Sequence, residues 1–254
     1  MFPVPGKLEI KNLAVEVGGV RVLHNIHLTV PPGEVHVLVG PNGSGKTSLL
    51  ATIAGYPQYR VVSGSISYDG TDLLPLGLTE RARLGIGLLE QRPPTINGVK
   101  LRLLLDYIGG DDPERKRFIE DLIKETDHAH LVDRNIHEDL SGGEIKKAGL
   151  LLLLARQPHF AMMDEPDSGV DMDSITLLCQ LMNRLLSPER EHPAKRRTGL
   201  IITHSDVILG RVSTDKAHVM IDGRVLCGGN PRIIMKKIRE SGFDSCVDCL
   251  HQGE

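Results

Sequence analysis

Residues 40–47 read Gly40-Pro41-Asn42-Gly43-Ser44-Gly45-Lys46-Thr47 and fit the pattern G-x-x-x-x-G-K-[ST]. The apolar stretch Val35 to Val39 before it is typical of a buried strand, and Ser48 to Ala54 after it predicts a helix that ends at Gly55. Glycines let the backbone approach an anion, and the N–H groups at a helix start favour negative charge. We therefore predict that residues 40–48 bind the phosphates of a nucleoside triphosphate. Lys46 is expected at the β- and γ-phosphates and the Thr47 hydroxyl at Mg²⁺.

Composition narrows the class of protein. The chain has 254 residues, 25% of them charged, and a net charge of −3, so no strongly basic surface indicates a nucleic-acid partner. The basic run Lys195 to Arg197 is interpreted as a solvated loop. The longest apolar run, Leu150 to Ala155, is too short for a bilayer, which needs about 20 residues. With four cysteines in no framework spacing and no signal peptide, we expect a soluble cytoplasmic protein without direct membrane insertion.

The expected elements place an all-helical stretch inside an α/β chain. Strands are expected at residues 8–13, 20–30, 35–39, 64–70, 85–90, 160–163, 199–203, 217–221 and 224–227, and helices at 48–54, 79–84, 99–108, 113–126, 144–155, 175–186 and 231–239. Pro113, preceded by Asp111 and Asp112 as capping candidates, marks one helix start. We expect one domain, 1–254, with a catalytic core from 1–91 and 146–230. A helical subdomain (92–145) is inserted, and a C-terminal helix and tail (231–254) follow.

Two further stretches carry candidate chemistry. The apolar strand Phe160 to Met163 ends in two acids, of which Asp164 is expected to reach Mg²⁺ and Glu165 to polarise an attacking water. Both roles require a carboxylate at the carboxyl end of a strand, beside the phosphates. Upstream, Leu140-Ser141-Gly142-Gly143-Glu144 opens a helix and offers a second N-terminus that can face an anion.

The order of these motifs resembles that of the ABC-type ATPases. The resemblance implies an α/β P-loop NTPase fold with a RecA-like core, an N-terminal antiparallel β-subdomain and an inserted helical subdomain. It also implies ATP and Mg²⁺ as cofactors and a head-to-tail pair, in which Ser141 and Gly143 of one copy contact the γ-phosphate held by the other. Gln91 matches the glutamine of the family's Q-loop, Asp171 the aspartate of its D-loop, and His204 its switch histidine.

By this resemblance the site residues fall into three groups. The catalytic group is Glu165, His204, Lys46 and Gln91, and the metal ligands are Thr47, Gln91 and Asp164. The nucleotide-binding group comprises residues 40–48 with Ser141, Gly142, Gly143 and Asp171. One departure concerns the base: ABC ATPases commonly stack adenine on an aromatic side chain near Val15 to Gly19, and this segment has none. Val17 or a neighbour is the expected replacement.

Three local features resemble the SufC-type ABC ATPases of iron–sulfur cluster assembly more than transporter subunits. They are Asp167 where transporters carry Thr or Ser, Glu144-Ile145-Lys146-Lys147 after the signature, and Arg92 to Val99 after Gln91. This similarity covers nearly the whole chain, and the divergent tail is compatible with the archaeal two-component version. It implies a SufB/SufD-like scaffold that docks near residues 91–101. The alternatives are the nucleotide-binding subunit of a membrane transporter and a nucleotide-gated module with little turnover.

The remaining cysteines and histidines carry weaker signals. Cys179 and Cys227 are interpreted as core residues. Cys246-Val247-Asp248-Cys249 with His251 is either half of a zinc or iron–sulfur site, completed by a second subunit, or an ordinary polar tail. His128, His130 and His137 have no ligand spacing and are expected at the surface.

Overall fold

The computed structural model describes residues 5–94, 96–126, 129–136, 140–187 and 196–243. Two sheets organise these residues. A four-stranded antiparallel sheet has the order β2-β1-β4-β5, with β1 (Leu8–Val17), β2 (Val20–Val30), β4 (Arg60–Tyr68) and β5 (Thr71–Asp72). A six-stranded sheet has the order β10-β9-β3-β8-β7-β6, with β3 (Val35–Val39), β6 (Ile86–Leu89), β7 (Phe160–Asp164), β8 (Thr198–Ile202), β9 (Lys216–Ile221) and β10 (Arg224–Gly229).

The six-stranded sheet is parallel except at one edge. β3 pairs in parallel with β8 and β9, β7 with β8 and β6, while β10 runs antiparallel to β9. Its central strands β3, β7 and β8 are buried along their whole length, as parallel strands covered on both faces require. The carboxyl ends of these strands meet at one edge, where ligands bind in open α/β sheets.

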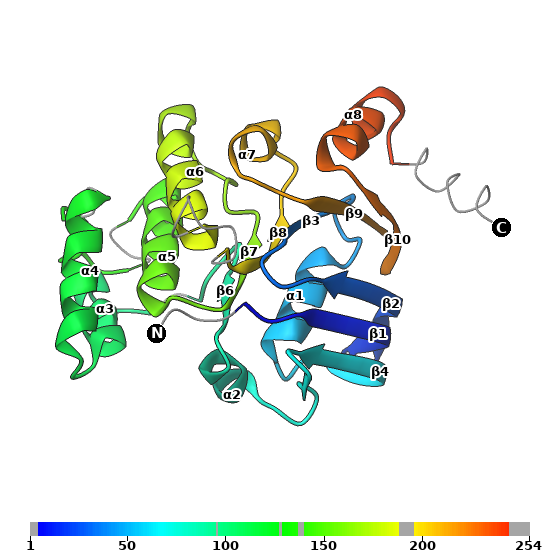
Figure 1. Cartoon of the computed structure of the whole chain (residues 1–254), viewed down its shortest axis with the longest axis horizontal. Helices are drawn as coiled ribbons and strands as arrows, with labels where there is room; N and C mark the ends of the chain where they lie inside the picture. Colours follow the sequence, from blue (N-terminus) through cyan, green and yellow to red (C-terminus); the bar gives the residue numbers. More distant parts are fainter. Residues whose placement is uncertain (1–4, 95, 127–128, 137–139, 188–195, 244–254) are drawn as a thin grey trace.

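The helices fall into separate groups around the sheets. The helices are α1 (Lys46–Ala54), α2 (Leu78–Arg83), α3 (Leu101–Gly109), α4 (Pro113–Glu125), α5 (Gly142–Arg156), α6 (Met172–Leu186), α7 (Asp206–Arg211) and α8 (Pro231–Ser241). Figure 1 shows α3, α4, α5 and α6 gathered at one side of the molecule, while α1 lies close to β1 and β2 on the other. This arrangement confirms the expected α/β fold with an antiparallel sheet and a helical insertion.

A small apolar core packs α7 and α8 against β3 and β9, and two larger cores correspond to the two groups. One core joins α3, α4, α5 and α6 to one face of the parallel sheet, through residues such as Leu105, Leu122 and Leu151. The other lies between the two sheets around α1, whose Leu49 and Ile53 are fully buried. The phosphate loop therefore leads into α1, which packs against residues of both sheets in this core. This packing fixes the position of the loop.

Several element bounds differ from the sequence-based expectation for local reasons. β1 continues to Val17 because a register shift at Asn12, whose φ is +50°, interrupts the alternation without ending the pairing. The strand expected at 64–70 ends at Tyr68, since Asp69 and Gly70 form a turn with positive φ. α7 was not expected at all; with six residues it is too short to show a helical period.

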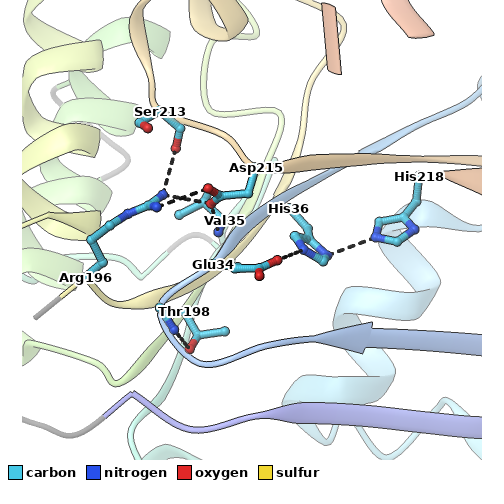
Figure 2. Close-up of polar contacts among 9 residues, drawn as sticks. Glu34, Val35, His36, Arg196, Thr198, Ser213, Asp215 and His218 are labelled. Carbon is cyan, nitrogen blue, oxygen red and sulfur yellow. Dashed lines mark hydrogen bonds and ion pairs between the residues drawn. The ribbon is translucent and has the colours of Figure 1, made fainter. Parts of the chain in front are cut away.

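A polar cluster fastens the start of β3 to the segment before β8 (Figure 2). Arg196 donates to both Asp215 oxygens, at 3.1 and 2.8 Å, and Asp215 Oδ2 also accepts the Val35 amide at 2.8 Å. Nearby, the Thr198 hydroxyl oxygen accepts the Gly33 amide at 3.1 Å. The strand that carries the phosphate loop is thus held at its beginning by side chains as well as by the sheet.

Candidate functional site

The phosphate loop follows β3 and adopts the conformation that its glycines permit. Gly43 and Gly45 have φ of +81° and +97°, values that disfavour other residues. Gly40 has no room for a side chain, since a Cβ there would lie 2.0 Å from the Met220 carbonyl oxygen. Gly45 is the N-cap of α1, and no side chain caps the helix. The first amides of α1 are therefore available to an anion.

Lys46 folds back over the loop that precedes it. Its Nζ donates to the carbonyl oxygens of Gly40 at 2.7 Å and Pro41 at 2.8 Å. Burial lowers the Lys46 pKa, and the carboxylates of Glu165 and Asp164 act in the opposite direction. A buried cation is thus placed between the loop and two acids, where phosphate oxygens would complete its coordination.

A cavity of about 600 Å³ opens beside the loop. Its lining includes the predicted residues Asn42, Gly43, Gly45, Lys46, Thr47, Ser48, Gln91 and Glu165. Gly40, Pro41 and Ser44 shape the loop without being part of the lining, and Ser44 is buried. The structure therefore brings the loop, the Q-loop glutamine and the catalytic candidate Glu165 to one cavity within a single chain.

The rest of the cavity wall was not expected from the sequence. It is formed by Arg21, Val22 and His24 of β2 and by Asp222 and Gly223 of the β9–β10 turn. The Gly223 amide donates to the Ser44 carbonyl at 3.0 Å, and the His24 amide to the Gly223 carbonyl at 2.8 Å. The hairpin turn was visible in the sequence, but its contact with the phosphate loop joins segments almost 180 residues apart and left no local signal.

Among the described residues that line this cavity, none is Phe, Tyr or Trp. Val17 does not line the cavity. The lining residues of β2 instead come after the segment Val15 to Gly19, where an adenine contact was expected. This wall includes an arginine, Arg21, a residue type whose guanidinium can stack on an aromatic face.

Asp164 and Thr47 have the properties of a divalent cation site. Burial raises the pKa of Asp164, while a hydrogen bond from the Thr47 side chain lowers it. Asp164 Oδ1 is buried and makes no hydrogen bond within the part of the chain that the structure describes. Hard cations such as Mg²⁺ prefer oxygen ligands of this kind, so these two side chains fit the expected metal. Gln91 instead directs its side-chain Nε2 toward Glu165 Oε2.

The Q-loop is also held from the other side, by a lysine whose contact the sequence did not predict. Lys146 of α5 is buried, and its Nζ donates to the main-chain oxygens of Gln91 at 2.6 Å and Glu90 at 3.3 Å. Burial lowers the Lys146 pKa. Gln91 therefore connects the Glu165 carboxylate with the helix that follows the signature motif.

The signature residues lie outside the nucleotide cavity. Ser141 caps α5: its Oγ accepts the Glu144 amide at 3.4 Å, and Glu144 Oε2 accepts the Ser141 amide at 2.7 Å. Gly142 lines a different hollow, together with Ser168 and Gly169. Asp171 caps α6 and approaches Gly143, where a Cβ would lie 3.9 Å from its Oδ2. One chain alone thus does not bring Ser141, Gly142, Gly143 or Asp171 to the phosphate loop.

His204 follows β8 and is not part of the cavity lining. Partial burial lowers its pKa, Lys46 lowers it further, and Glu165 and Asp167 raise it. His204 therefore lies close enough to Lys46, Glu165 and Asp167 for their charges to act on its imidazole. The Cys246 to His251 segment lies outside the described residues. Within the described ranges no cluster of His, Cys, Asp and Glu could hold a metal ion by itself.

A second, apolar hollow of about 840 Å³ lies next to the Q-loop. We name it the helical groove; its lining includes Leu88, Leu89, Glu90, Pro93, Pro94, Ile96, Leu104, Tyr107, Arg115, Leu152 and Arg156. Tyr107 is 85% exposed and Ile96 40% exposed. Exposed aromatic and aliphatic side chains around a concave surface are typical of a protein-binding site.

Comparison with known proteins identifies the family. The family model described as ABC transporter matches residues 23–168. A probable ABC transporter ATP-binding protein of Streptococcus pyogenes serotype M3 is 36% identical over 245 residues, covering 92% of each chain. The chain belongs to the ABC transporter ATP-binding family. It is accordingly an ABC ATPase, and it binds ATP.

Other relatives of this ABC ATPase have varied names. The probable ATP-dependent transporter ycf16 of Cyanidium caldarium is 35% identical, with 93% of this chain and 94% of the relative covered. Vegetative protein 296 of Bacillus subtilis is 34% identical, with 93% and 92% covered. The cassette of an ABC transporter in its ADP conformation superimposes with a TM-score of 0.73 at 25% identity, over 98% and 99% of the two chains.

A more distant neighbour shows the same fold inside a larger protein. It is a bacterial Atm1-family ABC exporter with ATP bound, which has a TM-score of 0.75 at 20% identity and is covered over 43% of its length. In the described part of our ABC ATPase, by contrast, no helix combines the length and the apolar character that a membrane span requires.

Proposed function

We propose that the protein is a cytoplasmic, Mg²⁺-dependent ATP hydrolase that works as a head-to-tail dimer and drives a partner protein. In the proposed site, residues 40–48, including the Lys46 side chain, hold the phosphates, and Thr47, Asp164 and Gln91 hold Mg²⁺. Glu165 polarises the attacking water, and His204 contacts the γ-phosphate region. The buried Asp164 Oδ1, which has no hydrogen-bond partner among the described residues, supports the metal assignment.

The dimer is proposed because the signature residues do not reach the cavity of their own chain. Ser141, Gly142 and Gly143 lie on the surface beside Asp171, so a second copy has to bring them to the phosphates. In this proposal residues 1–91 and 146–230 form the catalytic core that holds the nucleotide. Residues 92–145 form the helical subdomain, whose signature motif contacts the nucleotide of the other copy. Residues 231–254 form the terminal helix and tail.

A single observation supports a partner-driven role: the helical groove and the catalytic edge share the Q-loop. Glu90 lines the groove, and the next residue, Gln91, contacts Glu165. A partner that moves the groove would displace Gln91 with it, and closure of the dimer around ATP would move the groove. Shifting such an equilibrium from 1:99 to 99:1 requires about 5.5 kcal/mol of differential binding, which two shared nucleotides can supply.

We propose a SufB/SufD-like scaffold of iron–sulfur cluster assembly as the partner. The resemblance at Asp167, Glu144 to Lys147 and Arg92 to Val99 supports it, and Pro93, Pro94 and Ile96 of the last segment line the groove. A membrane transporter is the second candidate, because relatives that cover over nine-tenths of the chain are named as a transporter ATP-binding protein and as an ATP-dependent transporter.

An untagged co-expression pull-down from the source organism, followed by mass spectrometry and metal analysis, distinguishes the two partners. We expect a soluble protein that carries iron or accepts a reconstituted cluster. The Tyr107→Glu variant, changed at the exposed rim of the groove, should lose this partner and keep ATP hydrolysis. The exposed Ile233 provides the matched control, since Ile233→Glu changes an exposed apolar side chain on α8, which lies on the other side of the molecule from α3 (Figure 1). Recovery of a polytopic membrane protein would instead establish the transporter function.

A further inference from the structure

Asp167 lies two residues after Glu165, in the turn that follows β7. The turn is closed by the Ser168 amide, which donates to the Glu165 carbonyl at 3.1 Å, and by the Val170 amide, which donates to the Asp167 carbonyl at 3.2 Å. This geometry directs the Asp167 side chain toward the end of β8, the neighbouring strand. There its Oδ1 accepts the Thr203 hydroxyl at 3.1 Å.

Thr203 connects Asp167 to both sides of His204. Its side chain is completely buried, and its hydroxyl oxygen accepts the Ser205 amide at 3.0 Å. Ser205 in turn caps α7 by accepting the Ile208 amide at 3.5 Å. His204 is therefore located between two residues whose positions depend on the Thr203 hydroxyl.

We propose that Asp167 is a positioning residue that holds the His204 loop, through Thr203, in a fixed relation to Glu165. The inference rests on the catalytic roles proposed above for Glu165 and His204. A carboxylate only accepts hydrogen bonds, so it fixes the Thr203 hydrogen toward Asp167 and leaves the hydroxyl oxygen to the Ser205 amide. A serine or threonine at position 167 could donate as well as accept and would not impose this direction.

The negative charge of Asp167 also acts on His204, in addition to the hydrogen bonds through Thr203. His204 is also influenced by Glu165 on the same turn and by Lys46 of α1. Asp167 and Glu165 favour the protonated imidazole, whereas Lys46 and partial burial disfavour it. Asp167 thus makes both the orientation of His204 and the charge around it depend on the turn after β7, which also carries Glu165.

Turnover of the Mg-ATP-loaded enzyme provides the first test. In Thr203→Val, which keeps the shape and removes the hydroxyl, and in Asp167→Ala, kcat should fall by about 10- to 100-fold, the effect of a displaced catalytic group. The Kd for ATP should stay within about twofold, because neither residue lines the cavity. Asp167→Asn keeps an acceptor oxygen but adds a donor and loses the charge, so it should restore only part of the activity that Asp167→Ala loses. Thr126→Val removes a buried hydroxyl at the C-cap of α4 and should leave kcat unchanged.

Coupling and amide exchange separate this role from ordinary structural support. The double variant Asp167→Ala, Thr203→Val should be no slower than either single variant, because both break the same connection. In the nucleotide-free full chain, hydrogen exchange of the Ser205 amide should accelerate in both single variants and not in Thr126→Val. Additive losses, an unchanged Ser205 amide, or wild-type kcat in Thr203→Val would overturn the proposal. If His204→Ala itself keeps wild-type kcat, the proposed role of His204 is wrong, whatever the Asp167 variants do.

Discussion

Glu165 occupies a backbone conformation that is uncommon for its residue type. Its φ is +44°, a left-handed value that costs a non-glycine residue on the order of 1 kcal/mol. Bonds on both sides maintain it: the Glu165 amide donates to the Ile202 carbonyl at 3.0 Å, and the Glu165 carbonyl accepts the Ser168 amide. The same conformation starts the turn that brings Asp167 to Thr203. The backbone conformation of Glu165 therefore links this proposed catalytic carboxylate with the loop that carries His204.

His36 and His218 form a buried pair between β3 and β9 (Figure 2). His36 Nε2 lies 2.8 Å from Glu34 Oε2, and His36 Nδ1 lies 2.9 Å from His218 Nε2. The Glu34 carboxylate can only accept hydrogen bonds, so His36 donates to it from Nε2. His36 Nδ1 then accepts a hydrogen bond from His218 Nε2. This chain of bonds is complete when both rings are neutral. Burial lowers the pKa of His218 to about 3, against 6.5 for an ordinary histidine.

The pair predicts a loss of stability in acid. Between about pH 6.5 and pH 3 the unfolded state binds a proton at position 218 that the folded state does not. The free energy of unfolding should therefore fall as the pH falls through this window, by at most about 1.4 kcal/mol per unit for one histidine. Urea unfolding between pH 5 and pH 8 measures the slope. His218→Gln should flatten it, and His27→Gln, at an exposed position of β2, should not. Equal slopes in all three proteins would contradict the prediction.

At the scale of single elements, α1 depends on a buried arginine from α2. Arg81 Nη1 donates to the carbonyl oxygens of Thr52 at 2.7 Å and Ile53 at 2.9 Å, in the last turn of α1. The guanidinium satisfies acceptors that a helix end leaves open and complements the negative end of the helix dipole. The helix that presents Lys46 and Thr47 at one end is thus anchored at the other.

Arg81→Met should destabilise the protein by about 2 to 3 kcal/mol, because buried carbonyl groups lose charged donors. Thermal or urea unfolding measures the loss. Arg83→Met, at an exposed position of the same short helix, is the matched control and should change stability by less than about 0.5 kcal/mol. Since α1 also carries the phosphate loop, ATP should partly restore the Arg81→Met protein by binding to its folded state. Similar effects of the two substitutions would refute the capping role.

The elements that the sequence predicted correctly are those with local causes. Gly55 ends α1 with a φ of +93°, and the Asp112 side chain caps α4 just before Pro113. Contacts between distant segments had no such signal. Lys146 was recognised only as part of a motif, although it holds the Q-loop, and Asp222 was recognised only as a turn residue, although it lines the nucleotide cavity. Sequence patterns specify which elements form, whereas these contacts depend on how the two sheets and the helices pack together.

At the scale of the whole molecule, the two halves of the proposed reaction centre are separated within one chain. The phosphate loop and Glu165 line the nucleotide cavity, whereas Gly142 of the signature motif lines a different hollow beside the D-loop, and Gln91 lines both. A closed head-to-tail pair would place each signature helix N-terminus against the nucleotide of the other copy. Closure should then depend on ATP, and it should persist when hydrolysis is blocked.

Glu165→Gln is expected to trap this pair. The change keeps a side chain of the same shape beside Gln91 but removes the carboxylate that activates water, which should lower kcat by about 100-fold or more while ATP still binds. Sedimentation in saturating Mg-ATP should show a dimer that reverts to monomer when ATP is removed. Adding Ser141→Arg to this variant should abolish the dimer and preserve ATP binding by the monomer, since Ser141 is exposed and lies outside the cavity. Ser65→Arg, at an exposed position of β4, should leave the dimer intact. A Glu165→Gln protein that stays monomeric in saturating Mg-ATP, with and without its partner, would refute ATP-driven pairing.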